Sequence, residues 1–548
     1  MLAARAQEPD LATRELLRQQ ERERVLREQH RNQPDVRLER DAVEADGRLP
    51  VAETPCFPIR HILLEGDSSE HFQWVLAAAD PAGDPASGRC LGTAGVGEVM
   101  RRMQNAVIAR GYVTTRVLAA PQDLNAGKLV LTLLPGRIRS IHFDGDAAPG
   151  HGWKNAVPAR PGDILNLRAV EQALENLQRV PTATADIRFV PAEGKDAAPG
   201  ESDLVISWQQ PRRVRGNLSL DDGGSQATGK LQAAATLSLD NPLGWNDLAY
   251  VNVGCSLFNG SGKHTDNWSA HYSVPFGNWL LSANGGDYDY RQTVAGAYED
   301  YVYSGSSRNA ELRLARMLFR NAAGKTSAHA RGWWRDSDNF IDDTEVEVQR
   351  RRMAGWELGL SHKHFIGNAT LDANLAWRRG TGAFNALHAP EEAYGEGTAR
   401  ATLITADAQL VVPFQFGKQS LRYLAEWRGQ WNRTPLVPQD RFAIGGRYSV
   451  RGFDGEVSLA GERGWSWRNE LGVSLGGGQQ AYLGADYGHV GGPSTRWQMG
   501  DHLAGIAIGL RGGAGSVQWD AFVGSPVIKP QGYPTAYTTF GFSLGGSF

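Results

Sequence analysis

One short stretch of the sequence combines flexibility with positive charge. Residues 441–456, RFAIGGRYSVRGFDGE, bring glycines, aromatic residues and three arginines together in a region that otherwise alternates like β-strand. An arginine donates two parallel hydrogen bonds to a single carboxylate and so fixes a flexible segment better than a lysine does. The chemistry that this stretch indicates is the holding of a loop by an ion pair.

Residues that could support catalysis give weak signals. Gly324-Lys325-Thr326 ends like a phosphate-binding loop, but Phe319 stands where the first glycine of that loop belongs, and no strand-loop-helix context surrounds it. Residues 260–264, GSGKH, fail in the same way. No H-E-x-x-H zinc motif occurs. A β-turn is the better interpretation of both glycine-lysine segments, and we expect no enzyme, no cofactor and no metal site.

The three cysteines are too few for a disulfide scaffold and have no metal-ligand spacing. A bridge between Cys56 and Cys90 is possible in an oxidising compartment, and three unpaired buried thiols are the alternative. Cys255 alternates with apolar residues in LAYVNVGCSLF, so we expect it to lie on an outward face as a small hydrophobic residue.

Length and charge limit the class of protein. The 548 residues exceed the roughly 250–300 at which a single core stops growing, so we expect two or more domains. A formal net charge of −3 gives no reason to expect nucleic acid as a partner.

The start MLAARAQEPD lacks a basic segment followed by an apolar one, whereas residues 4–6 have the small-x-small form of a cleavage site. We expect a mature or nearly mature chain without its export signal.

The first 55 residues divide into a helix and a linker. Residues 1–32 are rich in Arg, Glu, Gln and Leu, with helical composition from about residue 8 but a thin apolar stripe that cannot bury itself in a large core. The alternatives are a solvated terminal helix or a helix lodged in a wet, polar cavity. Residues 33–55, with three prolines among polar residues, are expected to form a linker.

Two units with the same order of signals follow. In residues 56–134, CFPIRHILLEG indicates a strand, EHFQWVLAAA a short helix or an irregular loop, and GVGEVMRRMQNAVIARG an amphipathic helix before the strand pair YVTTRVL and KLVLTLL. Residues 135–211 repeat this order with RIRSIHFDG, LRAVEQALENLQRV, TADIRFV and DLVISWQQ. We expect two small α+β domains.

Residues 212–548 alternate between apolar and polar side chains and do not return to helix. No apolar run approaches the roughly 18–20 residues of a membrane helix, but membrane barrel strands need only about 9–11 residues. A soluble sandwich also alternates. The end of the chain favours an outer-membrane barrel, because TFGFSLGGSF sets apolar residues on one face and finishes on Phe548. At roughly 20 residues per strand and turn, the region would hold about 16 antiparallel strands.

The chain resembles the two-partner secretion (type Vb) outer-membrane transporters of the TpsB family, of the filamentous haemagglutinin, haemolysin and contact-dependent inhibition type. Val450-Arg451-Gly452-Phe453 is similar to the V-R-G-F/Y motif of their long inward-folded loop, here around residues 441–463. A four-residue motif recurs by chance, but the resemblance covers the whole chain. It includes segments such as CFPI, RCLG, QNAVIARGYVTTRVLAAPQDL, LPGRI, DNPLG and YSVPFG. It implies a plug helix, two polypeptide-transport-associated (POTRA) domains and a barrel.

The resemblance also implies a partner for the loop arginine. The G-x-D-x-G strand motif of the family matches Gly484, Asp486 and Gly488, and its aspartate is expected to pair with Arg451 as a loop latch. Alternation in QAYLGADYG directs Asp486 toward the lumen. Without the resemblance, the two residues would be read as ordinary lumen charges.

The function implied is export of one large secreted exoprotein, an adhesin, a haemolysin or a contact-dependent inhibition toxin, through the barrel in the Gram-negative outer membrane. The exoprotein is expected to dock on the periplasmic POTRA domains, at the strand edges in YVTTRVL or DIRFV or beside helices 96–110 and 167–179. Outer-membrane lipid or lipopolysaccharide and the barrel assembly machinery are expected as further partners of a monomer. The alternative is an insertase of the same superfamily, which usually carries more POTRA domains and no plug helix. An enzymatic barrel or passive porin is a third interpretation.

Overall fold

The computed structural model describes residues 11–30, 34–38, 47–145, 153–195, 197–260, 262–295 and 298–548. The expected cleavage site at residues 4–6, both ends of the expected first helix, and residues 33 and 39–46 of the expected linker lie outside these ranges. Among the described residues, no helix is both long enough and apolar enough to cross a membrane.

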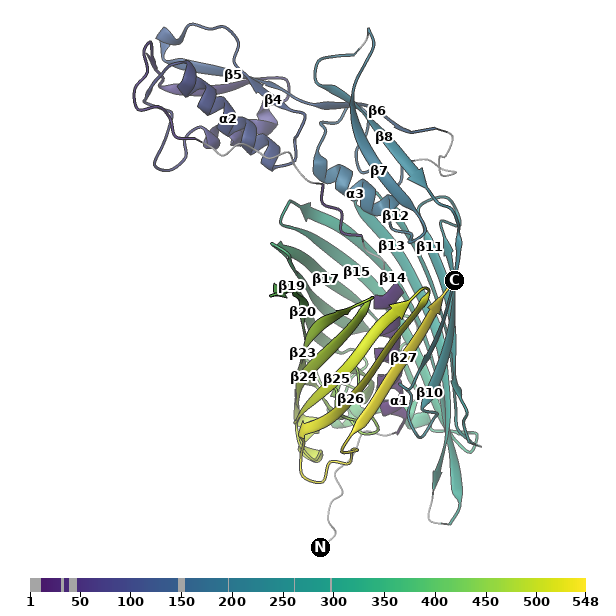
Figure 1. Ribbon diagram of the computed structural model, residues 1–548. Coiled ribbons are helices and arrows are strands. Elements are labelled where there is room, and N and C mark those ends of the chain that lie inside the picture. Colours follow the sequence, from purple (N-terminus) through teal and green to yellow (C-terminus); the bar gives the residue numbers. More distant parts are fainter. Residues whose placement is uncertain are drawn as a thin grey trace.

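A closed antiparallel barrel forms the C-terminal part of the protein (Figure 1). Sixteen strands pair in chain order, as expected, and the last strand closes the barrel on the first. They are β9 (Val214–Asp221), β10 (Leu231–Asp240), β11 (Leu248–Leu257), β12 (His264–Phe276), β13 (Trp279–Ala295), β14 (Asp300–Arg320), β15 (Gly324–Ile341), β17 (Arg351–Ile366), β18 (Ala369–Thr381), β19 (Thr402–Phe416), β20 (Gln419–Asn432), β23 (Arg463–Gly476), β24 (Gln479–Gly491), β25 (His502–Ala514), β26 (Val517–Ile528) and β27 (Thr539–Ser547).

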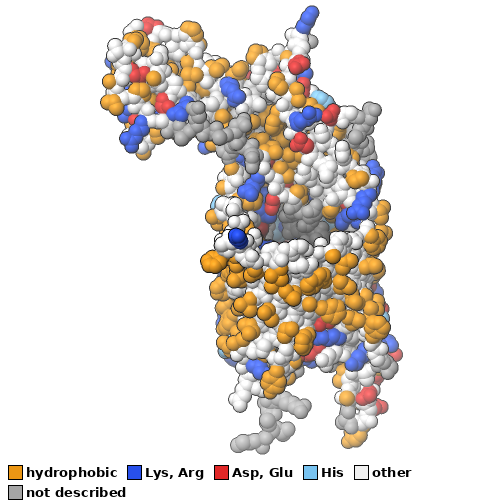
Figure 2. Space-filling view, viewed as in Figure 1, with side chains coloured by type: hydrophobic (Ala, Val, Ile, Leu, Met, Phe, Trp, Pro, Cys, Tyr) orange, Lys and Arg blue, Asp and Glu red, His pale blue; other side chains and the backbone are white. Residues whose placement is uncertain are grey.

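The outer surface of the barrel carries a belt of apolar side chains (Figure 2). Alternation along each strand produces it: on β11, Val251 and Val253 are exposed, whereas Tyr250 and Asn252 are buried. Cys255 lies on the same strand as a free, half-buried thiol. The apolar residues of the last segment also face outward: Phe540, Phe542, Leu544 and Phe548. Such a belt is what a lipid bilayer requires of a barrel wall.

Short elements occupy the connections between barrel strands. They are β16 (Thr344–Glu345), η3 (Glu347–Gln349), η4 (Pro390–Tyr394), η5 (Pro438–Asp440), β21 (Phe442–Ile444), β22 (Leu459–Gly461) and η6 (Pro493–Trp497). The longest connection that concerns the site joins β20 to β23, and β21 pairs with β22 within it to form a small hairpin. This hairpin supports the segment that carries Arg451.

The first α+β unit has a three-stranded sheet in the order β2-β5-β4, covered by one helix. Its elements are β1 (Phe57–Pro58), β2 (His61–Gly66), η1 (Ser69–Ala78), β3 (Cys90–Leu91), α2 (Thr93–Ala109), β4 (Arg116–Leu118), η2 (Leu124–Ala126) and β5 (Lys128–Leu134). Fully buried Val99, Met103 and Val107 line the face of α2 that packs on the sheet.

Two details of this unit differ from the expectation, and the expected short helix between them, EHFQWVLAAA, is present as a 3₁₀ helix. CFPIRHILLEG forms two strands, because its first part pairs with β3 and its second part pairs with β5. The backbone N–H of Ile59 still donates to Arg89 on the β3 side, whereas that of Arg60 donates to Gly127 beside β5. YVTTRVL is a strand only in its last three residues, because the backbone N–H of Thr115 donates to the carbonyl of Tyr112 and closes a turn.

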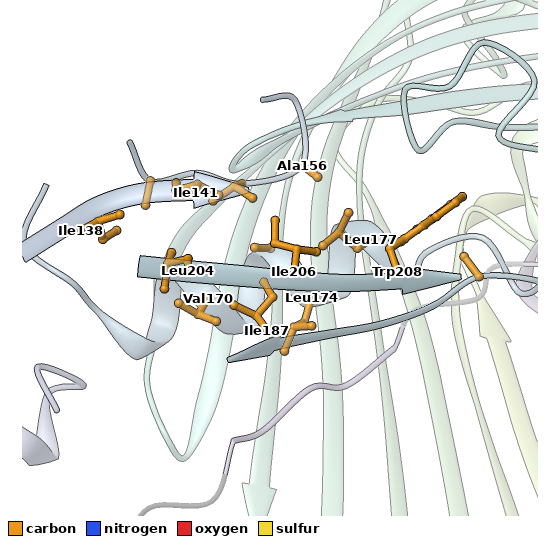
Figure 3. Close-up of a cluster of buried hydrophobic side chains, with 14 of the residues drawn as sticks. Ile138, Ile141, Ala156, Val170, Leu174, Leu177, Ile187, Leu204, Ile206 and Trp208 are labelled. Atoms are coloured by element: carbon orange, nitrogen blue, oxygen red, sulfur yellow. The ribbon is translucent and has the colours of Figure 1, made fainter. Parts of the chain in front are cut away.

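The second α+β unit repeats the arrangement with the sheet order β6-β8-β7. Its elements are β6 (Arg137–Phe143), α3 (Leu167–Leu177), β7 (Thr184–Pro191) and β8 (Glu201–Gln209). The side chain of Asn166 caps α3 by accepting a hydrogen bond from the backbone N–H of Arg168. Leu174 and Leu177 of α3 pack with Leu204 and Ile206 of β8 (Figure 3). Among the described residues, β4 and β7, which hold the expected docking edges, each pair with a neighbouring strand on one side only.

The second unit is fastened to the end of the barrel. Asn176 of α3 donates to the carbonyl of Gly277 in the β12–β13 turn at 2.8 Å, and Thr182 donates to the carboxylate of Asp240 at 2.9 Å. Because the sheet of the unit covers one side of α3 and the barrel end lies on another, nearly the whole helix is buried. The remaining helix, α1 (Leu11–His30), lies inside the barrel (Figure 1).

Candidate functional site

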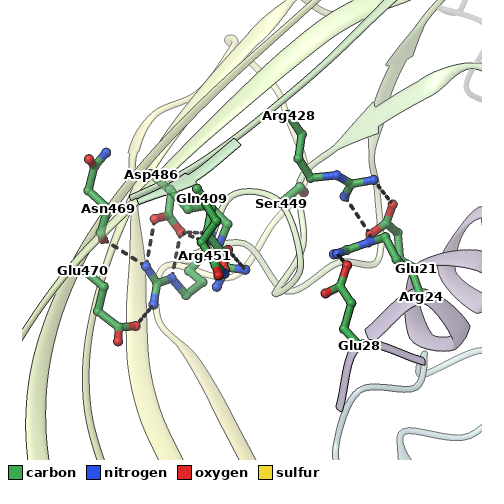
Figure 4. A network of polar contacts seen from close by, with 12 residues as sticks. Glu21, Arg24, Glu28, Gln409, Arg428, Ser449, Arg451, Asn469, Glu470 and Asp486 are labelled. Carbon is green, nitrogen blue, oxygen red and sulfur yellow. Dashed lines mark hydrogen bonds and ion pairs between the residues drawn. The ribbon is translucent and has the colours of Figure 1, made fainter. Parts of the chain in front are cut away.

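The structure brings Arg451 and Asp486 together in the lumen (Figure 4). Nε of Arg451 lies 2.8 Å from Oδ2 of Asp486 and Nη2 lies 2.9 Å from Oδ1, so the contact is bidentate. The backbone N–H of Arg451 also donates to Oδ2 at 2.9 Å. The carboxylate side chain is 1% exposed, and the loop segment is therefore held at its tip by three bonds to one buried group.

Two further acceptors, which sequence reasoning missed, complete the arginine site. Nη1 of Arg451 donates to Oε2 of Glu470 at 2.8 Å, and Nη2 donates to the backbone carbonyl of Asn469 at 3.1 Å. Arg511 binds the other carboxylate oxygen of Glu470. Glu470 lies on β23 opposite Gly484 of β24. A charged residue on the lumen face of the strand next to the motif was the signal that could have identified Glu470 as a partner of Arg451.

The glycines of the strand motif make room for the loop. A Cβ atom on Gly484 would lie 2.5 Å from Nη2 of Arg451, and one on Gly488 would lie 3.0 Å from a methyl carbon of Val450. Gly452, next to the arginine, has φ +101°, a conformation that only glycine adopts without strain. The motif residues therefore clear the volume that the guanidinium group and its neighbours fill.

Val450 and Phe453 anchor the same segment by packing. Val450 is fully buried and Phe453 is 3% exposed, and both belong to one apolar cluster inside the barrel. The ring of Phe453 meets the ring of Tyr533 edge to face, with 5.8 Å between centroids. Apolar packing on both sides of Arg451 excludes water from its ion pair.

Helix α1 is held in the lumen by polar contacts with the barrel wall. Arg22 forms a bidentate pair with Asp221 of β9 at 2.9 and 3.2 Å, and Glu21 forms one with Arg428 of β20 at 2.9 and 3.0 Å (Figure 4 shows the latter). Arg27 pairs with Glu311 of β14 at 2.9 Å. The helix thus contacts strands on different sides of the barrel through charges, as the interpretation of a helix in a polar cavity required.

The helix also contacts the loop that carries Arg451. Nη2 of Arg18 donates to the backbone carbonyl of Gly455 at 2.6 Å, and Nη1 of Arg14 donates to that of Glu456 at 3.2 Å. Both carbonyls follow Arg451 within five residues. Helix and loop therefore form one polar assembly that fills part of the lumen.

The remaining candidate residues lie outside the lumen. Cys56 and Cys90 form a disulfide that joins the β1 and β3 region of the first α+β unit. Lys325, of the phosphate-loop-like segment, lies at the start of β15 and pairs with Glu175 of α3 at 3.0 Å. Among the described residues, no group of His, Cys, Asp and Glu is arranged to hold a metal ion.

Three family descriptions match successive parts of the chain. Residues 57–136 match the POTRA domain of ShlB type and residues 137–191 match a POTRA domain. Residues 200–512 match the family described as haemolysin secretion/activation protein ShlB/FhaC/HecB. The two α+β units are therefore called the first and second POTRA domains below.

Known proteins are similar along nearly the whole chain. The outer membrane transporter CdiB-2 of Burkholderia pseudomallei is 37% identical over 97% of this chain and 93% of its own. The outer membrane transporter CdiB of Dickeya dadantii is 27% identical over 96% of this chain and 94% of its own. The structure of CdiB from Acinetobacter baumannii superposes with a TM-score of 0.87, at 30% identity over 98% of this chain and 99% of that one. With this barrel, this apolar belt and these matches, the chain is an outer-membrane protein that belongs to the ShlB/FhaC/HecB family of haemolysin secretion/activation proteins.

Proposed function

We propose that this protein exports one large secreted exoprotein from the periplasm to the cell surface through its barrel. The observation that carries the proposal is the position of α1, which lies in the lumen and is fastened by ion pairs to the wall and by hydrogen bonds to backbone carbonyls of the loop. When a segment of the chain itself fills the barrel, removal of that segment opens a path through the barrel. Family membership supports an exporter over an insertase.

The polar character of the plug contacts supports reversible closure. Ion pairs that water reaches contribute about 0.2–1 kcal/mol each, so a handful of them holds α1 by an amount that a competing contact can offset. An apolar helix buried in a core would resist withdrawal far more strongly, because each buried large apolar side chain contributes about 1.5–3 kcal/mol. Helix α1 has only a thin apolar surface, with Ala12 and Leu16 buried.

The loop latch of Arg451 and Asp486 is proposed to fix the loop against the wall while α1 is in place. Its two partners are buried, and the loop carbonyls beyond Arg451 contact Arg18 of α1. Movement of the plug and movement of the loop are therefore coupled. During export the loop would line the path of the exoprotein.

The POTRA domains are proposed to receive the exoprotein in extended form. Among the described residues, the outer edge of β7 pairs with no further strand, and such an edge accepts a strand through backbone hydrogen bonds. At β4 the side-chain amide of Gln104 already bonds to the backbone N–H of Val117 and the carbonyl of Thr115, so β7 is the better candidate. The CdiB names of two relatives favour a cargo of the contact-dependent inhibition class over adhesins and haemolysins. Folding of the cargo at the cell surface would drive export, without catalysis or a cofactor in the transporter.

The remaining partners belong to the same proposal. The apolar belt would contact outer-membrane lipid and lipopolysaccharide, and the barrel assembly machinery would insert the barrel. A barrel closed on itself leaves no strand edge for another copy, which favours a monomer.

Deletion of residues 8–32 tests the plug. The shortened protein, purified and reconstituted in planar bilayers, should show a larger single-channel conductance than the full chain. Heat-modifiable gel mobility checks that the barrel is folded in both. Equal conductance would remove α1 from the closed state. Export itself is tested in cells that lack this protein. They should no longer secrete the exoprotein encoded by a gene next to that of the transporter, and the full chain should restore secretion.

A further inference from the structure

Residues 34–38 lie between the second POTRA domain and the barrel as an alternating strip. Val36 and Leu38 pack against the apolar core of the POTRA domain. The intervening residues face the barrel: the guanidinium carbon of Arg37 lies 4.2 Å from the ring centroid of Phe365, and Asp35 pairs with Lys363 at 2.7 Å. Alternate residues of this segment thus contact two different partners, as in an extended chain.

Helix α3 receives the backbone of the segment through two glutamates. Glu171 and Glu175 are one helical turn apart and face the same way. Oε1 of Glu175 accepts the backbone N–H of Val36 at 3.1 Å, and Oε1 of Glu171 accepts that of Leu38 at 3.1 Å. The spacing of the carboxylates matches two alternate amides of an extended chain.

One barrel arginine completes this receiving surface. Arg320, at the end of β14, pairs with Glu171 at 3.0 Å and with Glu175 at 2.9 Å. It also donates to the backbone carbonyl of Val36 at 2.5 Å. The two glutamates are almost completely buried, and their charges are balanced by Arg320 and Lys325 of the barrel together with Arg168 of α3. Their carboxylate oxygens also accept the backbone N–H groups of the segment. We name the surface formed by Glu171, Glu175, Arg320 and the adjoining POTRA core the α3 surface.

The α3 surface recognises a backbone and two apolar side chains and little else of the segment. Backbone bonds with apolar contacts at alternate positions are a common way to bind extended peptides of varied sequence. Any extended segment with an aliphatic-x-aliphatic pattern could make the same contacts. The exoprotein proposed above would dock on this same domain in extended form.

We propose that residues 34–38 are an internal ligand of the α3 surface, and that an extended aliphatic-x-aliphatic segment of the exoprotein binds there in their place. The inference rests on the proposed export function and names the chemistry of the cargo segment. Docking of cargo at this surface would also determine whether α1 can leave the barrel.

That consequence follows from the length of chain between the two segments. Three residues separate His30, the end of α1, from Pro34, and this stretch spans at most about 14 Å when fully extended. Helix α1 has 20 residues and is therefore about 30 Å long. While residues 34–38 stay on the α3 surface, α1 cannot withdraw completely toward the POTRA side. Displacement of the segment by cargo would release the tether and permit opening.

A peptide-binding competition measures whether residues 34–38 occupy the α3 surface and whether another peptide can bind there in their place. The probe is a fluorescein-labelled peptide of residues 32–40, NQPDVRLER, added to the full-length protein in detergent. A tethered ligand competes at an effective concentration in the millimolar range, so the wild-type protein should bind the probe weakly. Substituting Val36→Asp and Leu38→Asp in the protein should evict its own segment and raise the affinity for the probe at least ten-fold.

Matched controls isolate the surface. Val51→Asp alters a fully exposed apolar residue, also before the first POTRA domain, and should bind the probe like the wild type. A probe with Asp at both apolar positions should bind none of the proteins. A photo-crosslinking group at the Leu position of the probe should attach to residues 167–177. If the double Asp variant fails to show heat-modifiable mobility, Val36→Ser with Leu38→Ser replaces it.

Two results would overturn the inference: equal probe affinity for the double variant and the wild type, or binding to the variant with crosslinks outside α3 and its neighbours. Coupling is tested in planar bilayers, where excess probe should increase open events of the wild type and the Asp-containing probe should not. Binding without opening would contradict the tether. Export of the exoprotein is assayed separately, so that export without displacement contradicts this inference alone, whereas absent export contradicts the proposed function.

Discussion

The guanidinium group of Arg451 and the carboxylate of Asp486 meet in a two-point contact, with 2.8 Å from Nε to Oδ2 and 2.9 Å from Nη2 to Oδ1. Gly484 leaves the volume that this guanidinium group fills, because a side chain there would begin 2.5 Å from Nη2. The pair therefore depends on the planar fork of arginine, on a buried acceptor and on the absence of a third side chain.

Removing the arginine should release the loop. Arg451→Ala leaves Asp486 and Glu470 buried without their shared cation, which typically costs about 3–5 kcal/mol, and Arg451→Lys restores the charge but not the fork. We expect export to fall most in the Ala variant and partly in the Lys variant, with faster hydrogen exchange across residues 447–456. Unchanged export by a folded Arg451→Ala barrel would separate the loop from the mechanism.

The ion pair between Arg22 of α1 and Asp221 of β9 should stabilise the closed state. Arg22→Ala and Asp221→Asn each remove the bidentate contact, so each should increase the open probability in planar bilayers by several-fold. Because both act through one contact, the double variant should add little to the larger single effect. Fully additive effects would show that the two residues act independently.

The disulfide between Cys56 and Cys90 should stabilise the first POTRA domain. The two residues are 34 apart, and closing a loop of this length lowers the entropy of the unfolded chain by the equivalent of about 3–4 kcal/mol. Cys56→Ser with Cys90→Ser should make this domain sensitive to limited proteolysis while the barrel keeps its heat-modifiable mobility. Cys255→Ser, at the free thiol on β11, is the control and should leave proteolysis unchanged.

Attachment of residues 34–38 should withstand mild acid and fail in strong acid. Burial by itself would raise the pKa of Asp35, but hydrogen bonds from Lys325 and Lys363 outweigh it and hold that pKa below its usual value. A lowered pKa in the attached state means that the contribution is complete above the ordinary carboxylate pKa of about 3.9 and is lost as pH falls through the lowered value.

Glu171, Glu175 and Arg320 also face this segment, so Asp35→Asn is needed to isolate one group. The probe for this test carries Asn in place of its own Asp, so that acid does not weaken the probe through the same carboxylate. Binding of this probe by the wild type should stay weak from pH 8 to pH 5 and should begin to rise only below about pH 4. The Asn variant should bind the probe more tightly at neutral pH and lose the part of the acid response that Asp35 supplies. An identical acid response in both proteins would assign it to the glutamates.

Strand-level organisation was predictable because its causes are local. Alternation in segments such as QAYLGADYG fixes which residues face the lumen, and the apolar ending at Phe548 indicates a barrel wall in lipid. The amphipathic helix at residues 93–109 and its sheet also follow from periodicity. Where a segment changes its partner strand, as CFPIRHILLEG does between β3 and β5, the expectation of one continuous strand was wrong.

The sequence by itself thus determined the barrel, its approximate strand number, the order of the two α+β domains and, through a resemblance, the partners Arg451 and Asp486. Only the tertiary structure decided that Glu470 shares the arginine, that Arg18 of the first helix reaches the carbonyl of Gly455, and that residues 34–38 lie on α3. These contacts join side chains from distant parts of the chain. Barrel closure and strand register bring these side chains together, and neither produces a periodic sequence pattern at the positions concerned.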